Sequence, residues 1–283
     1  MLQVYSRPEK NTASRVIAVA SGKGGVGKTM STVGLGRELA KLGHKVLIID
    51  LDTGLRNADL IMGVENRVVF TLWDVVKGRC ALHKALVYDK KYKRLLLLAT
   101  AQHCTADEFD VDEIAEVCRQ ARYGFDYILL DCPAGIESGF QQGLYSADEV
   151  VVVTTPEMSA IRDADKVVGF AQSLSKPVSV LVNMVRADMV SAGDMLSLEN
   201  VQSLLCVPLL GYLPYSAELC EGKDLLYGEG RMKYPEAVKK GYTEAALRLA
   251  GADMPLKDIP EAPFTEKLKY KLRRKLPILS IVR

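Results

Sequence analysis

Short apolar runs, separated by stretches with helical periodicity, constrain the fold of this chain more than any other feature. They occupy residues 16–20, 46–49, 95–98, 127–130, 150–153, 178–182 and 209–213. A strand that is apolar along its whole length must be buried on both faces, as in a parallel sheet covered by helices. The sequence therefore predicts an α/β protein with a doubly wound, mostly parallel sheet.

Length and composition indicate an ordinary globular protein. A chain of 283 residues can form one large α/β domain or two smaller ones, and we expect one. Hydrophobic residues make up 48% of the chain and charged residues 25%, as in a soluble protein. No run approaches the roughly 18 apolar residues of a membrane-spanning helix, and residues 1–11 are too polar for a signal peptide. We therefore expect a cytoplasmic protein.

A glycine-rich segment, Ser21-Gly-Lys-Gly-Gly-Val-Gly-Lys-Thr29, directly follows the first apolar run. It matches the phosphate-loop pattern G-x-x-x-x-G-K-[ST], with Gly22 and Gly27 as the fixed glycines. Such a loop can point consecutive N–H groups at an anion, beside the N-terminus of a helix that we expect to reach about Leu42. The predicted cofactor-binding residues are Gly22, Lys23, Gly24, Gly25, Val26, Gly27, Lys28, Thr29 and Met30. Lys28 is expected at the β and γ phosphates and Thr29 on Mg²⁺.

Polar residues follow three of the apolar runs, at the sheet edge where doubly wound folds bind ligands. Asp131 stands where phosphate-loop enzymes hold Mg²⁺, directly or through water, although a helix or turn cap would also explain it. Asp50 and Asp52 follow the second run, and strand alternation puts both on one side. One would orient an attacking water and the other would serve Mg²⁺ or the loop. The sequence does not divide these roles. Asn183 follows the sixth run.

The six cysteines form no C-x-x-C pair and no metal-like cluster with the three histidines. We expect them to be reduced thiols in or near the core. The missing C-x-x-C argues against an iron–sulfur carrier, and no substrate-pocket signature indicates a metabolic enzyme.

Several motifs resemble those of one ATPase family. The segment from Gly22 to Thr29 resembles the deviant Walker A motif of the ParA/MinD family, in which a second lysine, here Lys23, stands behind the first glycine. DLDTGLRN, DLIMG, DCPAGIE, PEMSAIRD and GDMLS resemble the membrane-associated branch that positions bacterial division. The resemblance covers about residues 16–250. It implies a P-loop NTPase fold and a slow, partner-stimulated ATPase that converts ATP to ADP and phosphate with Mg²⁺ as cofactor.

The resemblance also assigns roles to single residues. Lys23 corresponds to the lysine that reaches across a dimer interface to the nucleotide of the other subunit. Asp52 matches the aspartate that positions the hydrolytic water, and Asp131 matches the aspartate near Mg²⁺. The catalytic prediction is Lys23, Lys28 and Asp52, and the metal prediction is Thr29, Asp131 and, more weakly, Asp50.

Further positions match the family's dimer, partner and adenine sites. Asn57, Glu137 and Asp163, together with Lys23, correspond to the nucleotide-dependent dimer surface and the regulatory partner site. Asn183 and Pro214 lie where the family holds adenine. An arginine often follows that asparagine, whereas this chain has Met184, which weakens the adenine assignment.

The last twenty residues, 264–283, are basic and amphipathic. They carry seven basic side chains and one acidic one, a balance of +6 in a chain whose formal net charge is +2. On a helix, an apolar stripe would be flanked by basic residues, which is typical of an interfacial membrane helix, with a solvated basic tail as the alternative. The stripe consists of Phe264, Leu268, Leu272 and Leu276, and the basic residues include Lys267, Lys271, Arg274 and Lys275. Pro277 should end the helix, and the apolar residues beyond it would either insert as an extended segment or form a disordered end.

The predicted organisation has four parts. Residues 1–14 form an N-terminal extension, 15–250 the ATPase domain, 251–263 a proline-rich linker and 264–283 a membrane-targeting segment. The resemblance implies a homodimer when ATP is bound, located on the anionic cytoplasmic face of the cell membrane. It also implies that the protein helps to place the septum by recruiting the division inhibitor MinC, under a topological regulator such as MinE or a DivIVA-linked system.

Two related functions compete with this interpretation. A flagellar-number regulator would also carry a membrane tail, but it typically has an N-terminal motif with Gln and Arg that residues 1–15 do not show. A DNA-partition ATPase would use the basic cluster at 267–275 to contact DNA phosphates. Phosphate contacts need no interleaved leucines, which argues against DNA as a partner.

Overall fold

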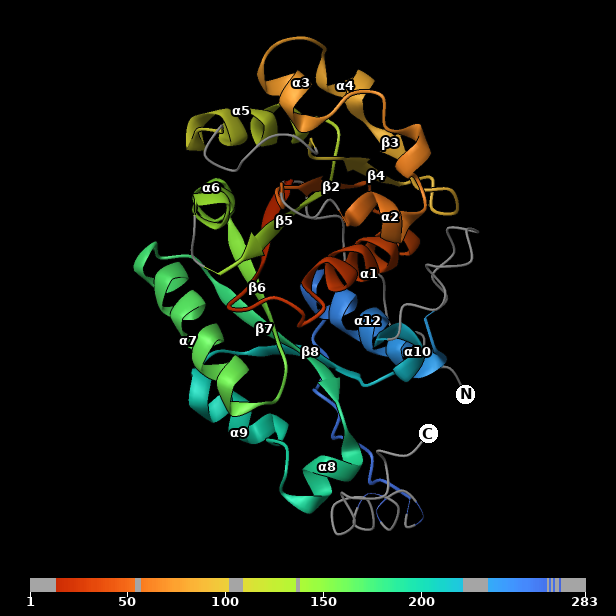
Figure 1. Ribbon diagram of the computed structural model, residues 1–283, viewed down its shortest axis with the longest axis vertical. Helices are drawn as coiled ribbons and strands as arrows, with labels where there is room; N and C mark the ends of the chain where they lie inside the picture. The colour runs from red at the N-terminus through yellow and green to blue at the C-terminus, as the bar shows by residue number, and fades with distance from the viewer. Residues whose placement is uncertain are drawn as a thin grey trace, which may run out of the picture.

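The computed structural model describes residues 14–53, 57–101, 109–135, 138–220 and 234–263, together with Thr265, Lys267 and Tyr270. One sheet with helices on both faces forms a single domain (Figure 1). The strands are β1 (Arg15–Ser21), β2 (Val46–Asp50), β3 (Val87–Tyr88), β4 (Leu95–Leu98), β5 (Tyr127–Ala134), β6 (Glu149–Thr154), β7 (Val178–Val185) and β8 (Leu209–Pro214).

The helices connect these strands and cover the sheet. They are α1 (Lys28–Lys41), α2 (Ala58–Met62), the 3₁₀ helix η1 (Glu65–Arg67), α3 (Leu72–Val76), α4 (Leu82–Ala85), α5 (Val111–Ala121), α6 (Ser138–Ser146), α7 (Met158–Ser173), α8 (Ala187–Ala192), α9 (Leu198–Leu205), α10 (Ala217–Cys220) and α12 (Glu236–Leu249).

The eight described strands follow the order β3-β4-β2-β5-β1-β6-β7-β8. All neighbouring pairs are parallel except β3 and β4, which are antiparallel. The chain winds from β1 toward β2 and later returns to β6 on the other side of β1, so the strand order reverses at the centre of the sheet. Doubly wound sheets bind ligands at such a switch point. The predicted fold class is therefore confirmed. The edge strand β3 was not predicted, because two residues give no periodicity.

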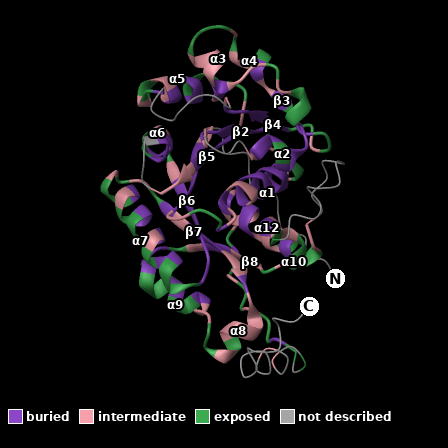
Figure 2. Ribbon diagram, in the orientation of Figure 1, coloured by how far each residue is buried: buried purple, intermediate pink, exposed green. Residues whose placement is uncertain are grey.

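Two apolar layers hold the sheet between its helices. Val16, Ala18 and Ala20 of β1 face the layer that contains α5, α6, α7 and α9. Ile17 and Val19 face the opposite layer, which contains α1, α2 and α12. The strands and α1 are buried at nearly every position, whereas α7 and α9 have exposed outer faces (Figure 2). This double burial explains why the strands have apolar runs rather than alternating polar residues.

Two strands extend beyond their apolar runs and carry polar residues within the sheet. Asp131 lies inside β5 and Asn183 inside β7, although we expected each to follow its strand. Pairing continues past a register shift in both places: Ser21 pairs with Ala134, and Val185 pairs with Pro214. The paired backbone thus fixes the position of Asp131, whereas Asn183 lies within the register shift between β7 and β8.

Residues 251–263 contain neither helix nor strand and lie along β8 and α12. The Arg248 guanidinium donates to the carbonyl oxygens of Met254 at 3.1 Å and Pro255 at 2.7 Å. The Tyr212 hydroxyl donates to the Asp258 carbonyl at 3.1 Å. This segment therefore follows the body of the domain up to the start of the tail.

Part of the sequence prediction lies outside the described residues. This holds for residues 1–13, for Glu137 and for most of the predicted membrane segment: Phe264, Leu268, Lys271, Leu272, Arg274, Lys275 and Leu276. Lys267 is described, and its ammonium lies 3.2 Å from Glu261 Oε2. Among the helices that are described, none is both long and apolar enough to cross a membrane.

Candidate functional site

The glycine loop connects β1 to α1 at the centre of the sheet. Gly25 and Gly27 have φ angles of 79° and 86°, in the left-handed region that glycine adopts without strain. Gly27 is the N-cap of α1, and its carbonyl accepts a hydrogen bond from Ser31 N at 2.9 Å. The free N–H groups of the first helical turn therefore face the loop. This arrangement suits an anion.

Neighbouring elements enforce the shape of the loop. A Cβ added to Gly22 would lie 2.2 Å from the carbonyl carbon of Asp163, and one added to Gly27 would lie 2.3 Å from Asn183 Nδ2. The same Nδ2 donates to the Val26 carbonyl at 2.8 Å. A Cβ on Gly24 would meet no atom within 4 Å. The loop is thus packed against α7 and β7 on one side and open on the other.

A buried ion pair lies directly behind the loop. Lys28 Nζ donates to Asp131 Oδ1 at 2.9 Å, and the two side chains are only 6% and 1% exposed. Thr32 Oγ1 lies 2.9 Å from the same oxygen, and Lys28 Nζ is 3.4 Å from Thr29 Oγ1. Burial alone would lower the pKa of Lys28, but the attraction of Asp131 outweighs it and raises the pKa. Lys28 therefore remains charged.

A second buried carboxyl group lies beside this pair. Asp50 pairs with Asp131 across β2 and β5, and neither residue is accessible to solvent. Burial and the neighbouring Asp131 raise the pKa of Asp50 well above its usual value. Among the described residues, the Oδ2 atoms of Asp50 and Asp131 have no hydrogen-bond partner. Unpartnered carboxylate oxygens near the N-terminus of α1 fit the predicted binding of Mg²⁺ with a nucleotide phosphate.

The magnesium site would not be a cage built by the protein alone. Within the described ranges, no three His, Cys, Asp or Glu side chains gather as metal ligands. Mg²⁺ at nucleotide sites is usually bound through one or two protein oxygens together with phosphates and water. Thr29 and Asp131 fit that pattern, whereas the tight Lys28 contact at Asp131 Oδ1 leaves Oδ2 as the available oxygen.

Asp52 lies differently from our expectation. Strand β2 ends at Asp50, so alternation along the strand does not extend to Asp52. Instead, Asp52 N donates to Asp50 Oδ1 at 3.0 Å, and the Asp52 side chain is half-buried in the following loop. The structure therefore separates the two aspartates into one fully buried group and one partly exposed group.

Thr32 was not predicted as a site residue. It lies one helical turn beyond Lys28 and reaches the same Asp131 oxygen. The spacing of four residues on one helix face was the available signal, although the phosphate-loop pattern ends at Thr29.

Lys23 lies at the rim of the loop. Its Nζ is 3.4 Å from Ser159 Oγ and 3.6 Å from Glu157 Oε2, at the start of α7. The side chain is 35% exposed, unlike that of Lys28. Asp163, one turn further along α7, forms an ion pair with Lys166 at 3.0 Å. The two loop lysines thus have opposite environments, one at the surface and one in the core.

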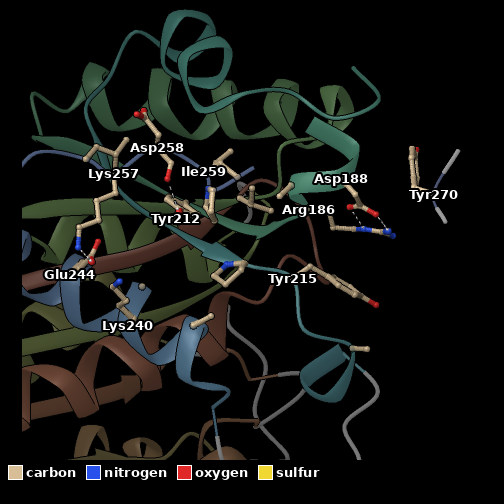
Figure 3. Close-up of a pocket in the computed structure, with 18 of the residues that line it drawn as sticks. Arg186, Asp188, Tyr212, Tyr215, Lys240, Glu244, Lys257, Asp258, Ile259 and Tyr270 are labelled. Atoms are coloured by element: carbon tan, nitrogen blue, oxygen red, sulfur yellow. Dashed lines mark hydrogen bonds and ion pairs between the residues drawn. The ribbon is translucent and has the colours of Figure 1, made fainter. Parts of the chain in front are cut away.

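The remaining predicted positions are spread around this site. Asn57 is the N-cap residue of α2, and its carbonyl accepts from Ile61 N at 3.0 Å. Pro214 lines a cavity of about 860 Å³ between α8, β8, α12 and residues 256–260 (Figure 3). The lining includes Tyr215 but neither Asn183 nor the glycine loop. The two predicted adenine residues therefore occupy neighbouring strands but different surroundings.

Of the described cysteines, Cys80, Cys118, Cys132 and Cys206 are free thiols. Burial raises the pKa of both Cys118 and Cys132 to about 12. Cys132, although adjacent to Asp131, is therefore protonated and unreactive at neutral pH.

The doubly wound sheet, the glycine loop between β1 and α1, and the buried lysine behind it define a P-loop NTPase fold. A family model described as an AAA domain matches residues 14–182. The septum site-determining protein MinD of Synechocystis is 43% identical over 269 residues, which cover 93% of this chain and 98% of that protein. The chain belongs to the MinD family of septum site-determining proteins.

Solved structures agree with this assignment. The MinC:MinD cell division protein complex of Aquifex aeolicus matches with a TM-score of 0.79 and 40% identity, covering 88% of this chain and 100% of that chain. MinD of Pyrococcus horikoshii, solved in complex with Mg-ADP, matches with a TM-score of 0.72 and 28% identity, covering 85% and 100%. Proteins of this family include a cell division ATPase.

Proposed function

We propose that this protein is a membrane-associated ATPase that dimerises when it binds ATP and helps to place the division septum by recruiting a division inhibitor. The observation that carries the proposal is the contrast between the two loop lysines. Lys28 is buried against Asp131, whereas Lys23 is 35% exposed at the rim of the same loop. We infer that Lys28 acts on the nucleotide of its own subunit and that Lys23 reaches a second molecule.

The nucleotide would be held by the glycine loop and the first turn of α1. The backbone N–H groups of residues 22–30 would bind its phosphates, and Lys28 would supply a positive charge beside them. Thr29 and Asp131 would hold Mg²⁺, which neutralises developing phosphate charge when bound. Asp52, half-buried beside this site, would orient the attacking water. The Mg-ADP bound by the Pyrococcus horikoshii relative supports these cofactors.

Dimerisation would couple the nucleotide to the membrane. Near an anionic leaflet each basic residue contributes about 1 kcal/mol, but ordering each helical residue costs about 1–2 kcal/mol, so a single tail binds weakly. Two tails joined in a dimer make the second insertion intramolecular, and avidity can then rise by about 100-fold or more. ATP would therefore favour peripheral attachment to the cytoplasmic face, and hydrolysis would release the protein.

The partner would be MinC, because the matching Aquifex aeolicus structure is a MinC:MinD complex. Lys23, Asn57, Glu137 and Asp163 are proposed for the dimer and partner surfaces, with MinE or a DivIVA-linked system as topological regulator. The relatives described above are septum site-determining or cell division proteins, which favours this function over flagellar-number control or DNA partition.

The exposed lysine provides the test. Lys23→Ala should still bind ATP, because Lys28 and the loop backbone remain, but it should stay monomeric with ATP in multi-angle light scattering. Lys93→Ala, which removes an exposed lysine at a different surface, is the matched control and should dimerise like the unmodified protein. A normal ATP-dependent dimer of Lys23→Ala would refute the role of this lysine across the interface.

A further inference from the structure

The described part of the tail contacts the domain through Tyr270. The Tyr270 hydroxyl donates to Asp194 Oδ2 at 2.9 Å, and the Arg186 guanidinium carbon lies 5.6 Å from the centre of the Tyr270 ring. The same guanidinium lies 5.6 Å from the Tyr215 ring. Arg186 therefore lies within cation–π distance of two aromatic rings, one from the body of the domain and one from the tail. Figure 3 shows Arg186 paired with Asp188, Tyr215 at the end of β8 and Tyr270 on the separate tail segment.

Contacts within the domain hold the Arg186 side chain in place independently of the tail. Its Nη2 and Nε donate to the two carboxylate oxygens of Asp188 at 2.6 and 3.2 Å. Asp188 in turn accepts from Met189 N at 3.0 Å within α8. Burial alone would raise the pKa of Asp188, but Arg186 outweighs this effect and lowers it. A two-point pair of this kind holds the guanidinium plane in one orientation.

Both ends of α8 take part in the contact. Arg186 is the N-cap residue of α8, and Asp194 directly follows its C-cap, Gly193, which has a φ of 77°. Asp194 N donates to the Met189 carbonyl at 3.0 Å, so the turn that carries the Asp194 carboxylate is itself hydrogen-bonded. The tail tyrosine thus meets two side chains that the same short helix positions.

Tyr270 does not belong to the predicted membrane stripe. At about 100° per residue, position 270 lies about 180° from the centre of the stripe formed by positions 264, 268, 272 and 276. The stripe residues themselves lie outside the described structure, so this placement follows from their spacing in the sequence. A contact through Tyr270 therefore uses the opposite face of the helix.

We propose that Arg186, Tyr215 and Asp194 form a docking surface for the first turns of the chain's own tail helix. In this proposal Tyr270 anchors the tail, and the spacing of the predicted apolar stripe places it on the side of the helix opposite Tyr270. A helix of about a dozen residues is unstable in water by itself, and a preformed first turn reduces the ordering that membrane binding requires. The value of this surface for membrane binding rests on the proposed function, whereas the docking contact does not.

The docking contact can be tested without a membrane. We expect Arg186→Ala and Tyr270→Ala to accelerate hydrogen exchange in tail peptides of the full-length protein by about two- to fivefold, the effect of one exposed cation–π contact. Arg186→Lys should have a smaller effect, because it keeps the charge but loses the planar stack. Tyr123→Ala removes a tyrosine that is 87% exposed and should leave tail exchange unchanged. Unchanged exchange in both alanine variants would overturn the docking surface.

Cosedimentation with phosphatidylglycerol-containing vesicles then tests what the docking does. With ATP, Arg186→Ala and Tyr270→Ala should bind vesicles about two- to fivefold more weakly per tail, while still forming the ATP-dependent dimer. Tighter or equal vesicle binding would overturn the inference that docking assists membrane binding, since tighter binding would mean that the docked tail is held back from the membrane. If a chain that ends at Pro263 bound as well as the full chain, the proposed function would fail, and hydrogen exchange would still decide the docking contact.

Discussion

The phosphate-loop region and the tail-docking region both lie at strand ends, but they are built in opposite ways. Behind the loop, Lys28 and Asp131 are 6% and 1% exposed and lie 2.9 Å apart. At the docking surface, the Arg186 side chain is 34% exposed, and its guanidinium carbon lies 5.6 Å from the centre of the Tyr270 ring. Buried charges are costly to separate, whereas exposed stacking and ion pairs contribute about 1 kcal/mol or less. The loop region is therefore fixed by the fold, whereas the contacts at the docking surface contribute little to stability.

The largest effect is expected at Lys28. Lys28→Gln would leave Asp50 and Asp131 buried without a cation. This change should lower the free energy of unfolding, measured by urea unfolding, by about 3–5 kcal/mol and abolish nucleotide binding. Lys166→Gln is the matched control, because its ion pair with Asp163 is exposed and should contribute about 0.5 kcal/mol or less. Equal stability losses in the two variants would show that the buried pair is not special.

The packing of the loop predicts the next largest effect. In Gly22→Ala the new methyl group would overlap the backbone of Asp163, and the shift needed to relieve the overlap should cost about 1–3 kcal/mol and weaken nucleotide binding. Gly24→Ala, where the new Cβ meets nothing within 4 Å, should differ little from the unmodified protein in urea unfolding. If Gly24→Ala lowered the free energy of unfolding as much as Gly22→Ala, the described packing of the loop would be contradicted.

The buried carboxyl group of Asp50 should make the stability of the protein depend on pH. Because its native pKa is raised above the unfolded value, the native state binds more protons, and this contribution to stability is lost as pH rises through the native pKa. Asp50→Asn should flatten that decline and raise the Tm at neutral pH by about 2–4 °C, the shift for about 1 kcal/mol. Asp165→Asn, at an exposed position, serves as the control in calorimetry. If the stability of Asp50→Asn fell more steeply with rising pH than that of the unmodified protein, the raised pKa assigned to Asp50 would be wrong.

The smallest effect on the free energy of unfolding is expected at the docking surface. Arg186→Lys should change the free energy of unfolding by about 0.5 kcal/mol or less, because its ion pair with Asp188 is partly exposed. Urea unfolding provides the measurement. If Arg186→Lys lowered the free energy of unfolding as much as Lys28→Gln, the docking surface would be part of what holds the fold together. The contrast between the two regions would then be lost.

The sequence predicted the elements that depend on local pattern. The apolar runs located seven of the eight described strands, and the glycine-loop pattern located the start of α1 within one residue. Asp131 was found because it adjoins a buried run. Only β3 was missed, since two residues at an antiparallel edge carry no periodic signal.

What the sequence did not show are contacts between distant segments. The approach of Asp163 to Gly22 depends on how α7 crosses the loop, and no local pattern encodes it. Likewise, Arg186 and Tyr270 lie 84 residues apart in the sequence, and they meet because residues 251–263 follow β8 and α12 before Tyr270. The unpartnered oxygens of Asp50 and Asp131 follow from strand register, which the runs do not fix. The roles of the predicted site residues therefore remain predictions.

Cosedimentation with anionic vesicles is the decisive measurement for ATP-dependent attachment of this protein to the membrane. The full chain and a chain that ends at Pro263 would each be measured with ATP and with ADP. We expect only the full chain with ATP to bind strongly, because ATP joins two weakly binding tails in one dimer. Binding that is the same with ATP and ADP, or that survives removal of the tail, would contradict it.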